Sequence, residues 1–180
     1  MKRIAGLGIA AALLVLAGGF WLATTPPTGG PQAGEEVEVI VPQGSGALAI
    51  ALQHRFPNAE VHAVDVSADA TAVARGNINA SGLDVTLHRG DLFDPLPAAL
   101  RGRVDLLISN PPYIATTDHA NLPSEVRDHE PPIALFGGSD GLSVLRRLIA
   151  GAPDWLAPDG LLACEIGEEQ GRAVAALAAG

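Results

Sequence analysis

Short apolar runs rich in β-branched residues alternate with alanine-rich helical patterns from residue 38 onward. This alternation is typical of a parallel sheet whose faces are covered by helices. We expect strands at residues 38–41, 60–64, 85–89, 104–109 and 161–166. We expect helices at residues 47–55, 68–79, 142–155 and 168–179, with a long loop after the fourth strand. The pattern therefore predicts an α/β domain with five strands over residues 37–180.

The beginning of the chain has a different pattern. Lys2 and Arg3 precede a long uncharged stretch. Its apolar part, residues 4–23, has about the length of a helix that crosses a hydrocarbon layer of about 30 Å. We expect residues 1–25 to be a membrane anchor made of one transmembrane-type helix, with a cleaved signal peptide as the alternative, and residues 26–36 to be a Pro/Gly-rich linker.

Composition and charge narrow the classes of function. The chain of 180 residues is 48% hydrophobic and 17% charged, which is typical of a globular domain. The first 30 residues hold two basic residues and no acid, so the remainder carries nine basic against 20 acidic residues, a net charge of −11. Such a body has little attraction for phosphates, and we expect no nucleic acid partner.

Cysteine and histidine usage indicates no metal site. The single cysteine, Cys164, excludes an internal disulfide and a thiolate zinc site, and its apolar surroundings in the sequence predict a buried structural thiol. The five histidines show no metal-ligand spacing, and we expect them on the surface or at the edges of the core.

Ligands of parallel α/β folds collect at the carboxyl ends of the strands, so the residues after each strand are the candidate site. The first strand runs into Gly44, Ser45 and Gly46, which permit a tight turn and close backbone approach before a helix N-terminus. The second strand ends at Asp65, whose carboxylate can accept hydrogen bonds from both hydroxyl groups of a ribose. Ser67 is better placed than Asp65 to cap the next helix.

The third strand is followed by Asp91 and Leu92. Asp91 offers a polar group for the edge of an adenine ring, and Leu92 offers an apolar side chain for its face.

The fourth strand leads into the most specific stretch of the chain, which consists of Asn110, Pro111, Pro112 and Tyr113. Each proline fixes φ and removes a donor, so the Asn110 side chain and the adjoining carbonyl are held rigidly at the sheet edge. An amide side chain offers an acceptor and two donors, which suits it to bind another planar amide or amino group. Tyr113 can lie against that planar group.

These stretches together carry a resemblance to a known family. The sequences SNPPYI and EVRDHEPPIALFGGSDGL, with VDVSADATAVARGNINASGL and GDLFDPL before them, resemble the S-adenosylmethionine-dependent methyltransferases that modify a glutamine side-chain nitrogen in peptide chain release factors. The resemblance covers roughly residues 44–180. It implies a Rossmann-like class I methyltransferase sheet, S-adenosyl-L-methionine as cofactor, a release factor as partner, N5-methylation of its glutamine, and the cytoplasmic location of that family.

The resemblance also implies roles for individual residues. The residues that it places at the cofactor are Gly44, Ser45, Gly46, Asp65, Asp91, Leu92 and Asn110. The residues that it places at the acceptor amide, as catalytic and substrate-binding groups, are Asn110, Pro111, Pro112 and Tyr113. Glu130 helps to shape the acceptor side.

The chain also departs from the family. An acidic residue normally closes the first strand and a glycine opens the loop, where this chain has Ile40 and Pro42. The family has a helical domain in front and further strands behind, so we expect the methyltransferase domain to be incomplete and C-terminally truncated. Residues 1–50 instead resemble the N-terminus of membrane-anchored endolytic murein transglycosylases. Lys2 and Arg3 should keep the N-terminus of such an anchor in the cytoplasm, which places the body of the chain outside the cytoplasm.

Two other functions remain open. The same asparagine, two prolines and tyrosine occur in enzymes that methylate the exocyclic amine of adenine in DNA, although a body charge of −11 argues against DNA binding. A non-enzymatic, membrane-anchored fusion fragment related to the endolytic transglycosylases is the alternative from a different class.

Overall fold

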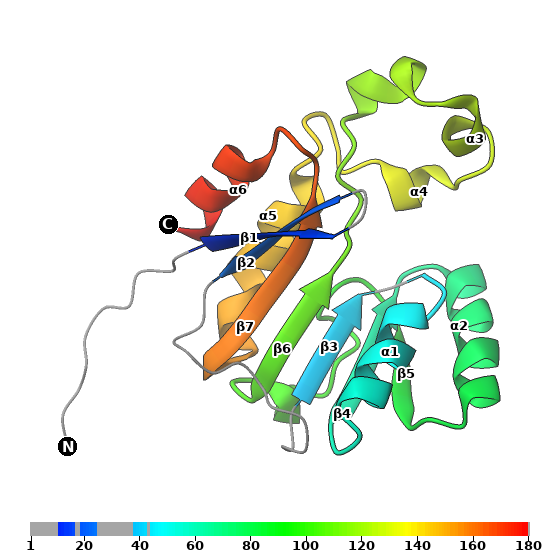
Figure 1. Ribbon diagram of the computed structural model, residues 1–180, viewed down its shortest axis with the longest axis vertical. Coiled ribbons are helices and arrows are strands. Elements are labelled where there is room, and N and C mark those ends of the chain that lie inside the picture. The colour runs from blue at the N-terminus through cyan, green and yellow to red at the C-terminus, as the bar shows by residue number, and fades with distance from the viewer. Residues whose placement is uncertain (1–10, 17–18, 25–37, 43, 180) are drawn as a thin grey trace.

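The computed structural model describes residues 11–16, 19–24, 38–42 and 44–179. They form one seven-stranded sheet with helices on both faces (Figure 1). The strands are β1 (Ala11–Leu16), β2 (Gly19–Thr24), β3 (Glu38–Pro42), β4 (Glu60–Asp65), β5 (Val85–Arg89), β6 (Val104–Ser109) and β7 (Leu156–Ile166). The α-helices are α1 (Ala47–Arg55), α2 (Ala68–Ser81), α3 (Ser124–Arg127), α4 (Pro132–Leu135), α5 (Ser143–Gly151) and α6 (Gly171–Ala178). The 3-10 helices are η1 (Ala98–Leu100), η2 (Thr116–Asn121) and η3 (Ala152–Asp154).

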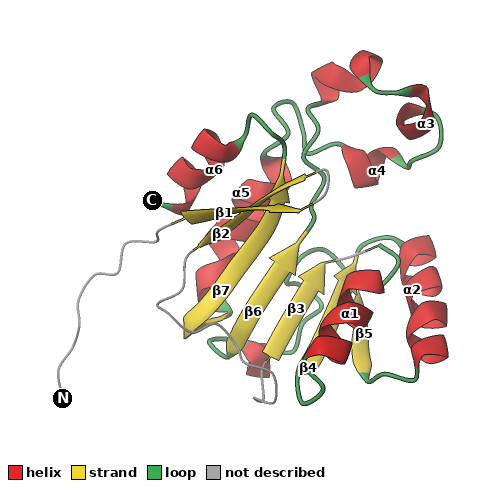
Figure 2. Ribbon diagram, in the orientation of Figure 1, coloured by secondary structure: helices red, strands yellow, loops and turns green. Residues whose placement is uncertain are grey.

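The order of strands across the sheet is β1-β2-β7-β6-β3-β4-β5. The five strands from β3 to β7 are mutually parallel, so the predicted α/β sheet is confirmed. Their carboxyl ends therefore share one edge, where the loops after β4, β5 and β6 converge. Figure 2 shows η2, α3 and α4 as a small group beyond this edge, on the long connection between β6 and α5.

Two apolar clusters hold the helices to the sheet, one on each face. Alternate residues of a strand point to opposite faces, so Leu106 joins the cluster under α1 and α2, whereas Leu107 joins the cluster under α5. Leu107 is fully buried together with Leu145 and Leu148 of α5. Both faces of the parallel sheet are thus covered, as the nearly continuous apolar run of β6 predicts.

Cys164 and His62 lie in this interior. The predicted burial of Cys164 is confirmed, and loss of hydration raises the pKa of its thiol to about 12. The expected location of the histidines is wrong for His62, which is only 3% exposed. Its ring stacks on His88, with 2.9 Å between Nδ1 of His62 and Nε2 of His88, and its Nε2 lies 3.2 Å from a carboxylate oxygen of Glu60. These partners satisfy the ring nitrogens and make burial of a polar ring tolerable.

Local sequence chemistry fixes several helix boundaries. Ser67 caps α2 as predicted, because its hydroxyl accepts a hydrogen bond of 3.2 Å from the backbone N–H of Ala70. The helix expected over residues 142–155 ends earlier, at Gly151, and a 3-10 turn that contains Pro153 follows. Proline lacks the N–H that an α-helix interior needs. The last helix begins at Gly171 rather than residue 168, since residues 167–170 form a turn closed by Gln170 N–H and the Gly167 carbonyl.

The expected transmembrane-type helix over residues 4–23 is not found in the described residues. Residues 11–16 and 19–24 are antiparallel strands instead, and β2 pairs with β7 from Phe20–Ile166 to Ala23–Ala163. A short apolar run can form a buried strand as well as a helix, and β7 otherwise leaves backbone donors and acceptors unpaired along its outer edge. No helix among the described ranges is long and apolar enough to cross a membrane.

Other predictions for the N-terminal part lie outside the described residues. These are the part of the anchor before residue 11 and the linker over residues 26–36.

Candidate active site

A cavity of about 470 Å³ lies at the carboxyl ends of the parallel strands. This volume is in the range of small-molecule sites. Its walls come from the residues that follow β4, β5 and β6, from α4 and from the N-terminal half of α5. The sequence-predicted site residues that line it are Gly44, Asp65, Asp91, Leu92, Asn110, Pro111 and Pro112. Segments far apart in the sequence therefore meet in one cavity, as the rule for strand ends predicts.

Asp65 closes β4 on one side of the cavity. Its Oδ1 accepts a hydrogen bond of 2.7 Å from the backbone N–H of Ser67, which fixes the carboxylate at the start of α2. Partial burial raises the pKa of Asp65 above its ordinary value, an effect opposed by this hydrogen bond. The second carboxylate oxygen can accept hydrogen bonds from the hydroxyl groups of a ligand in the cavity.

The loop after β5 contributes Asp91 and Leu92 in an unusual backbone conformation. Leu92 has φ 46°, in the left-handed region, and is alone in this among the non-glycine residues of the described ranges. Such strain often marks a binding site, because the surrounding structure must hold it in place. The Asp91 carboxylate accepts a hydrogen bond of 2.7 Å from Arg147 of α5, which also lines the cavity.

The turn after β6 is joined to the segment that follows α4 by backbone hydrogen bonds. Ile114 N–H donates to the Leu135 carbonyl at 3.0 Å, and Gly137 N–H donates to the Ile114 carbonyl at 2.9 Å. Gly137 is required here, because a Cβ atom at this position would lie 2.4 Å from the Pro112 carbonyl oxygen. The turn is therefore rigid, while the Asn110 side chain stays exposed at the cavity.

Tyr113 and Glu130, predicted at the acceptor side, do not line the cavity in the described part of the chain. The Tyr113 hydroxyl donates a hydrogen bond of 3.1 Å to Oε1 of Glu165 at the end of β7. Burial, followed by the negative charge and hydrogen bonding of Glu165 and the charge of Glu130, raises the pKa of Tyr113. Glu130 is thus close enough to act on the ring electrostatically from the long connection between β6 and α5.

The glycine loop after β3 has two different parts. Gly44 lines the cavity, whereas Ser45 and Gly46 do not. Gly46 has φ 79° at the start of α1, and a Cβ atom there would lie 3.2 Å from the Ala74 side chain of α2. Its role in the described structure is close packing of α1 against α2. The Ser45 carbonyl accepts a hydrogen bond of 2.9 Å from Asn77.

Sequence reasoning missed three residues that support this site. Ser109 lines the cavity wall, is 0% exposed, and its hydroxyl has no hydrogen-bond partner among the described residues. Arg147 holds Asp91, and Glu165 holds Tyr113. Glu165 could have been found by applying the strand-end rule to the last strand, whose end is followed by polar residues.

Comparisons with known proteins agree with this geometry. A family profile described as "Methyltransferase small domain" matches residues 37–125. The fold resembles that of the ribosomal protein L11 methylase from Lactobacillus delbrueckii subsp. bulgaricus, with a TM-score of 0.56 at 22% identity over 80% of this chain and 59% of the other. It also resembles a methyltransferase from Pyrococcus furiosus, with a TM-score of 0.57 at 20% identity over 82% of this chain and 64% of the other. At these identities the likeness concerns the fold.

Closer relatives are found among the sequences. The chain is 54% identical over 126 residues to the ribosomal protein uL3 glutamine methyltransferase of Bradyrhizobium diazoefficiens, covering 69% of this chain and 38% of that protein. It is 49% identical over 137 residues to the release factor glutamine methyltransferase of Thermosynechococcus vestitus, covering 75% of this chain and 47% of that protein. The chain thus spans less than half the length of these relatives. Residues 37–125 belong to the methyltransferase small-domain family, and the chain is a relative of the protein glutamine methyltransferases.

Proposed function

We propose that the chain transfers a methyl group from S-adenosyl-L-methionine to the side-chain nitrogen of a glutamine in a protein. The observation that carries the proposal is the position of Asn110. This amide projects from a rigid turn at the same cavity that Asp65 and Leu92 line. An amide suited to bind the acceptor and groups suited to bind a nucleoside therefore line the same cavity.

The residues of the cavity fit the cofactor. Asp65 offers a carboxylate oxygen for the ribose, and Leu92 offers an apolar surface for the adenine. When bound, the cofactor supplies an electrophilic methyl group on a sulfonium sulfur.

The chain's own contribution is to position the acceptor. An amide nitrogen is a weak nucleophile because its lone pair is delocalised into the carbonyl. Hydrogen bonds from the acceptor N–H groups to the Asn110 side-chain oxygen and the Pro111 carbonyl orient that nitrogen toward the cavity. Positioning of this kind can lower a barrier by about 7–11 kcal/mol without a covalent nucleophile. The nitrogen gains the methyl group as the bond between methyl and sulfur breaks and the sulfonium becomes a neutral thioether, and it loses one N–H proton to solvent.

Two protein acceptors deserve testing. A release factor is the acceptor that we propose first, since the relative from Thermosynechococcus vestitus is named for that substrate. Ribosomal protein uL3 is the second, since the relative from Bradyrhizobium diazoefficiens is named for it at similar identity. The net charge of −11 on the body disfavours the third acceptor, adenine in DNA.

The test compares these acceptors directly. The purified chain is incubated with methyl-labelled S-adenosylmethionine and either unmethylated release factor, unmethylated uL3 or duplex DNA. We expect label in release factor, located by mass spectrometry on one glutamine and lost when that glutamine is replaced by asparagine. Label in uL3 alone would move the proposal to the second acceptor. Label in DNA alone, or in none of the three, would overturn it.

A further inference from the structure

Tyr113 is held by two residues of the short segment 165–170, which runs from the end of β7 to the start of α6. Glu165 accepts a hydrogen bond from the Tyr113 hydroxyl, at 3.1 Å. Gln170 donates a hydrogen bond of 2.8 Å from Nε2 to the Tyr113 backbone carbonyl. The ring and the backbone of one residue are thus attached to the same short segment, which lies outside the cavity lining.

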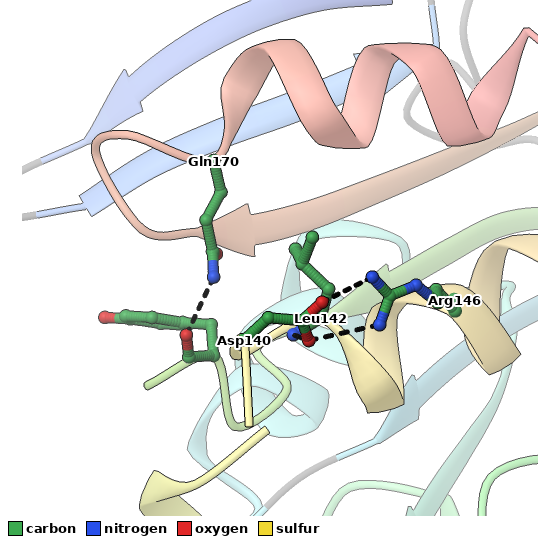
Figure 3. A network of polar contacts seen from close by, with 5 residues as sticks. Asp140, Leu142, Arg146 and Gln170 are labelled. Atoms are coloured by element: carbon green, nitrogen blue, oxygen red, sulfur yellow. Dashed lines mark hydrogen bonds and ion pairs between the residues drawn. The ribbon is translucent and has the colours of Figure 1, made fainter. Parts of the chain in front are cut away.

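The contact made by Gln170 uses both halves of its amide. While Nε2 donates to Tyr113, Oε1 accepts a hydrogen bond of 2.9 Å from the backbone N–H of Gly167. Figure 3 shows Gln170 pointing from the start of α6 toward the region of Asp140 and Leu142. Only an amide offers a donor and an acceptor in this planar arrangement. A glutamate could keep the Gly167 contact but could not donate to a carbonyl.

The backbone at Gly141 packs closely against this contact. Gly141 has φ 73°, and a Cβ atom there would lie 2.2 Å from the Tyr113 carbonyl oxygen and 2.7 Å from Nε2 of Gln170. The loop that contains Gly141 is itself held by Asp140, which accepts hydrogen bonds from Leu142 N–H and from Arg146 (Figure 3). Gln170 therefore joins two rigid segments at the base of the turn.

We propose that Gln170 is a positioning residue of the acceptor site, which fixes the Asn110–Tyr113 turn through the Tyr113 carbonyl. The inference rests on the proposed function, because it assigns to that turn the task of holding the acceptor amide. Gln170 touches neither the cavity nor the Asn110 side chain in this arrangement. Its effect on transfer is therefore indirect and confined to the acceptor side.

Two substitutions separate the halves of the contact. Gln170→Glu keeps an acceptor for Gly167 N–H and removes the donor to Tyr113, while Gln170→Met removes both and keeps the volume. For both variants we expect kcat for a glutamine substrate to fall about 10- to 100-fold, as a small misplacement of reacting groups can do. The dissociation constant for S-adenosylhomocysteine, measured by calorimetry, should stay as in the original chain.

A second readout needs no turnover. Tyr113 is the only tyrosine of the chain, so its ionisation can be followed by ultraviolet absorbance without overlap from other tyrosines. In Gln170→Met the freed ring should leave Glu165 and become more hydrated, and the pKa of Tyr113 should fall toward its ordinary value. Gln53→Met is the matched control. Gln53 is buried and, like Gln170, donates to a backbone carbonyl, that of Ala59 at 3.1 Å. It lies on α1, so its loss should change neither the Tyr113 titration nor kcat.

The outcomes distinguish this proposal from the proposed function. An unchanged Tyr113 titration in Gln170→Met overturns the positioning role, even in a chain that transfers no methyl group. A shifted Tyr113 titration also overturns the role if kcat is unchanged in both Gln170→Met and Gln170→Glu. So does a loss of affinity for S-adenosylhomocysteine as large as the loss of kcat. If Gln170→Met does not fold, the kcat and the dissociation constant of Gln170→Glu decide. Absence of transfer by the original chain would refute the proposed function and leave the titration as the test of Gln170.

Discussion

The carboxylate of Asp65 and the backbone N–H of Ser67 are joined by a hydrogen bond of 2.7 Å where β4 passes into α2. This contact places an acid at the cavity wall and leaves Ser67 free to cap the helix with its hydroxyl. The predicted cap at Ser67 is confirmed, and Asp65 lies at the cavity because it is the residue nearer the strand end. The binding of a ribose by Asp65 stays a prediction.

Replacing Asp65 by asparagine should weaken cofactor binding about tenfold, since a hydrogen bond to a charged group contributes about 1.5–3 kcal/mol. Asparagine keeps an oxygen for Ser67 N–H but loses the charge that a ribose hydroxyl prefers. Calorimetric titration with S-adenosylhomocysteine measures the change. Binding that is unchanged in Asp65→Asn would remove Asp65 from the cofactor site.

The same substitution should stabilise the protein at neutral pH. Burial raises the pKa of Asp65 in the folded state, so ionisation opposes folding, and the penalty is complete above the folded-state pKa. As the pH falls below 3.8, the ordinary pKa of an aspartate, Asp65 becomes neutral in both states and the advantage of asparagine should vanish. Urea unfolding of both proteins over this pH range is the measurement. An advantage that persisted in acid would mean that charge is not its cause.

Two serine-to-alanine substitutions should change stability in opposite directions. Ser109→Ala removes a buried hydroxyl without a partner in the described structure and should raise the free energy of unfolding by about 1 kcal/mol. Ser67→Ala removes the cap of α2 and should lower it by about 1 kcal/mol. Denaturant unfolding measures both. A loss of stability in Ser109→Ala would show that its hydroxyl has a partner in solution.

Stability should fall as the solution is made mildly acidic. Burial lowers the pKa of His62 despite the opposing charge and hydrogen bond of Glu60, and burial followed by the neighbouring His62 lowers the pKa of His88. Below pH 6.5, the ordinary pKa of histidine, these side chains bind protons in the unfolded chain but not in the folded one. The free energy of unfolding therefore decreases until the pH falls below the folded-state pKa values. His62→Met should weaken this pH dependence. An identical dependence in the variant would place its origin elsewhere.

Restoring the family's pattern in the second half of β3 should tighten cofactor binding. Ile40→Asp with Pro42→Gly would return an acid and a flexible loop near the cationic amino group of S-adenosylmethionine, and a gain of several-fold is expected. Ile40→Asn with Pro42→Gly is the control without the charge. Calorimetry that shows equal affinity in the two double variants would mean that the acid does not reach the ligand.

The sequence predicts the parallel sheet well because its elements are local and periodic. Residues 104–109 form β6 as expected, and α1 spans the residues predicted for it. The part of the cavity lining that follows β4, β5 and β6 can be predicted from the strand-end rule, whereas the part from residues 131–147 cannot. The short helices of residues 116–135 are less predictable, because they are too short to show an amphipathic pattern.

The largest error concerns residues 11–24. An apolar run of this length reads as a helix when taken alone, whereas the structure uses part of it to pair with the outer edge of β7. Edge pairing depends on which strand is last in the sheet, and that information lies some 140 residues further along the chain. Contacts such as Arg147 with Asp91 were missed for the same reason, because they join surfaces that only the folded chain brings together.

If the Asn110 amide binds the glutamine amide of the acceptor at the cavity, its loss should stop methyl transfer without loss of the cofactor. The rate of methyl transfer to the glutamine of the accepted protein is measured for the original chain, for Asn110→Ala and for Asn121→Ala, a control on the exposed helix η2. We predict that Asn110→Ala abolishes transfer while calorimetric affinity for S-adenosylhomocysteine stays nearly intact, and that Asn121→Ala retains both. Turnover that survives in Asn110→Ala would contradict the account.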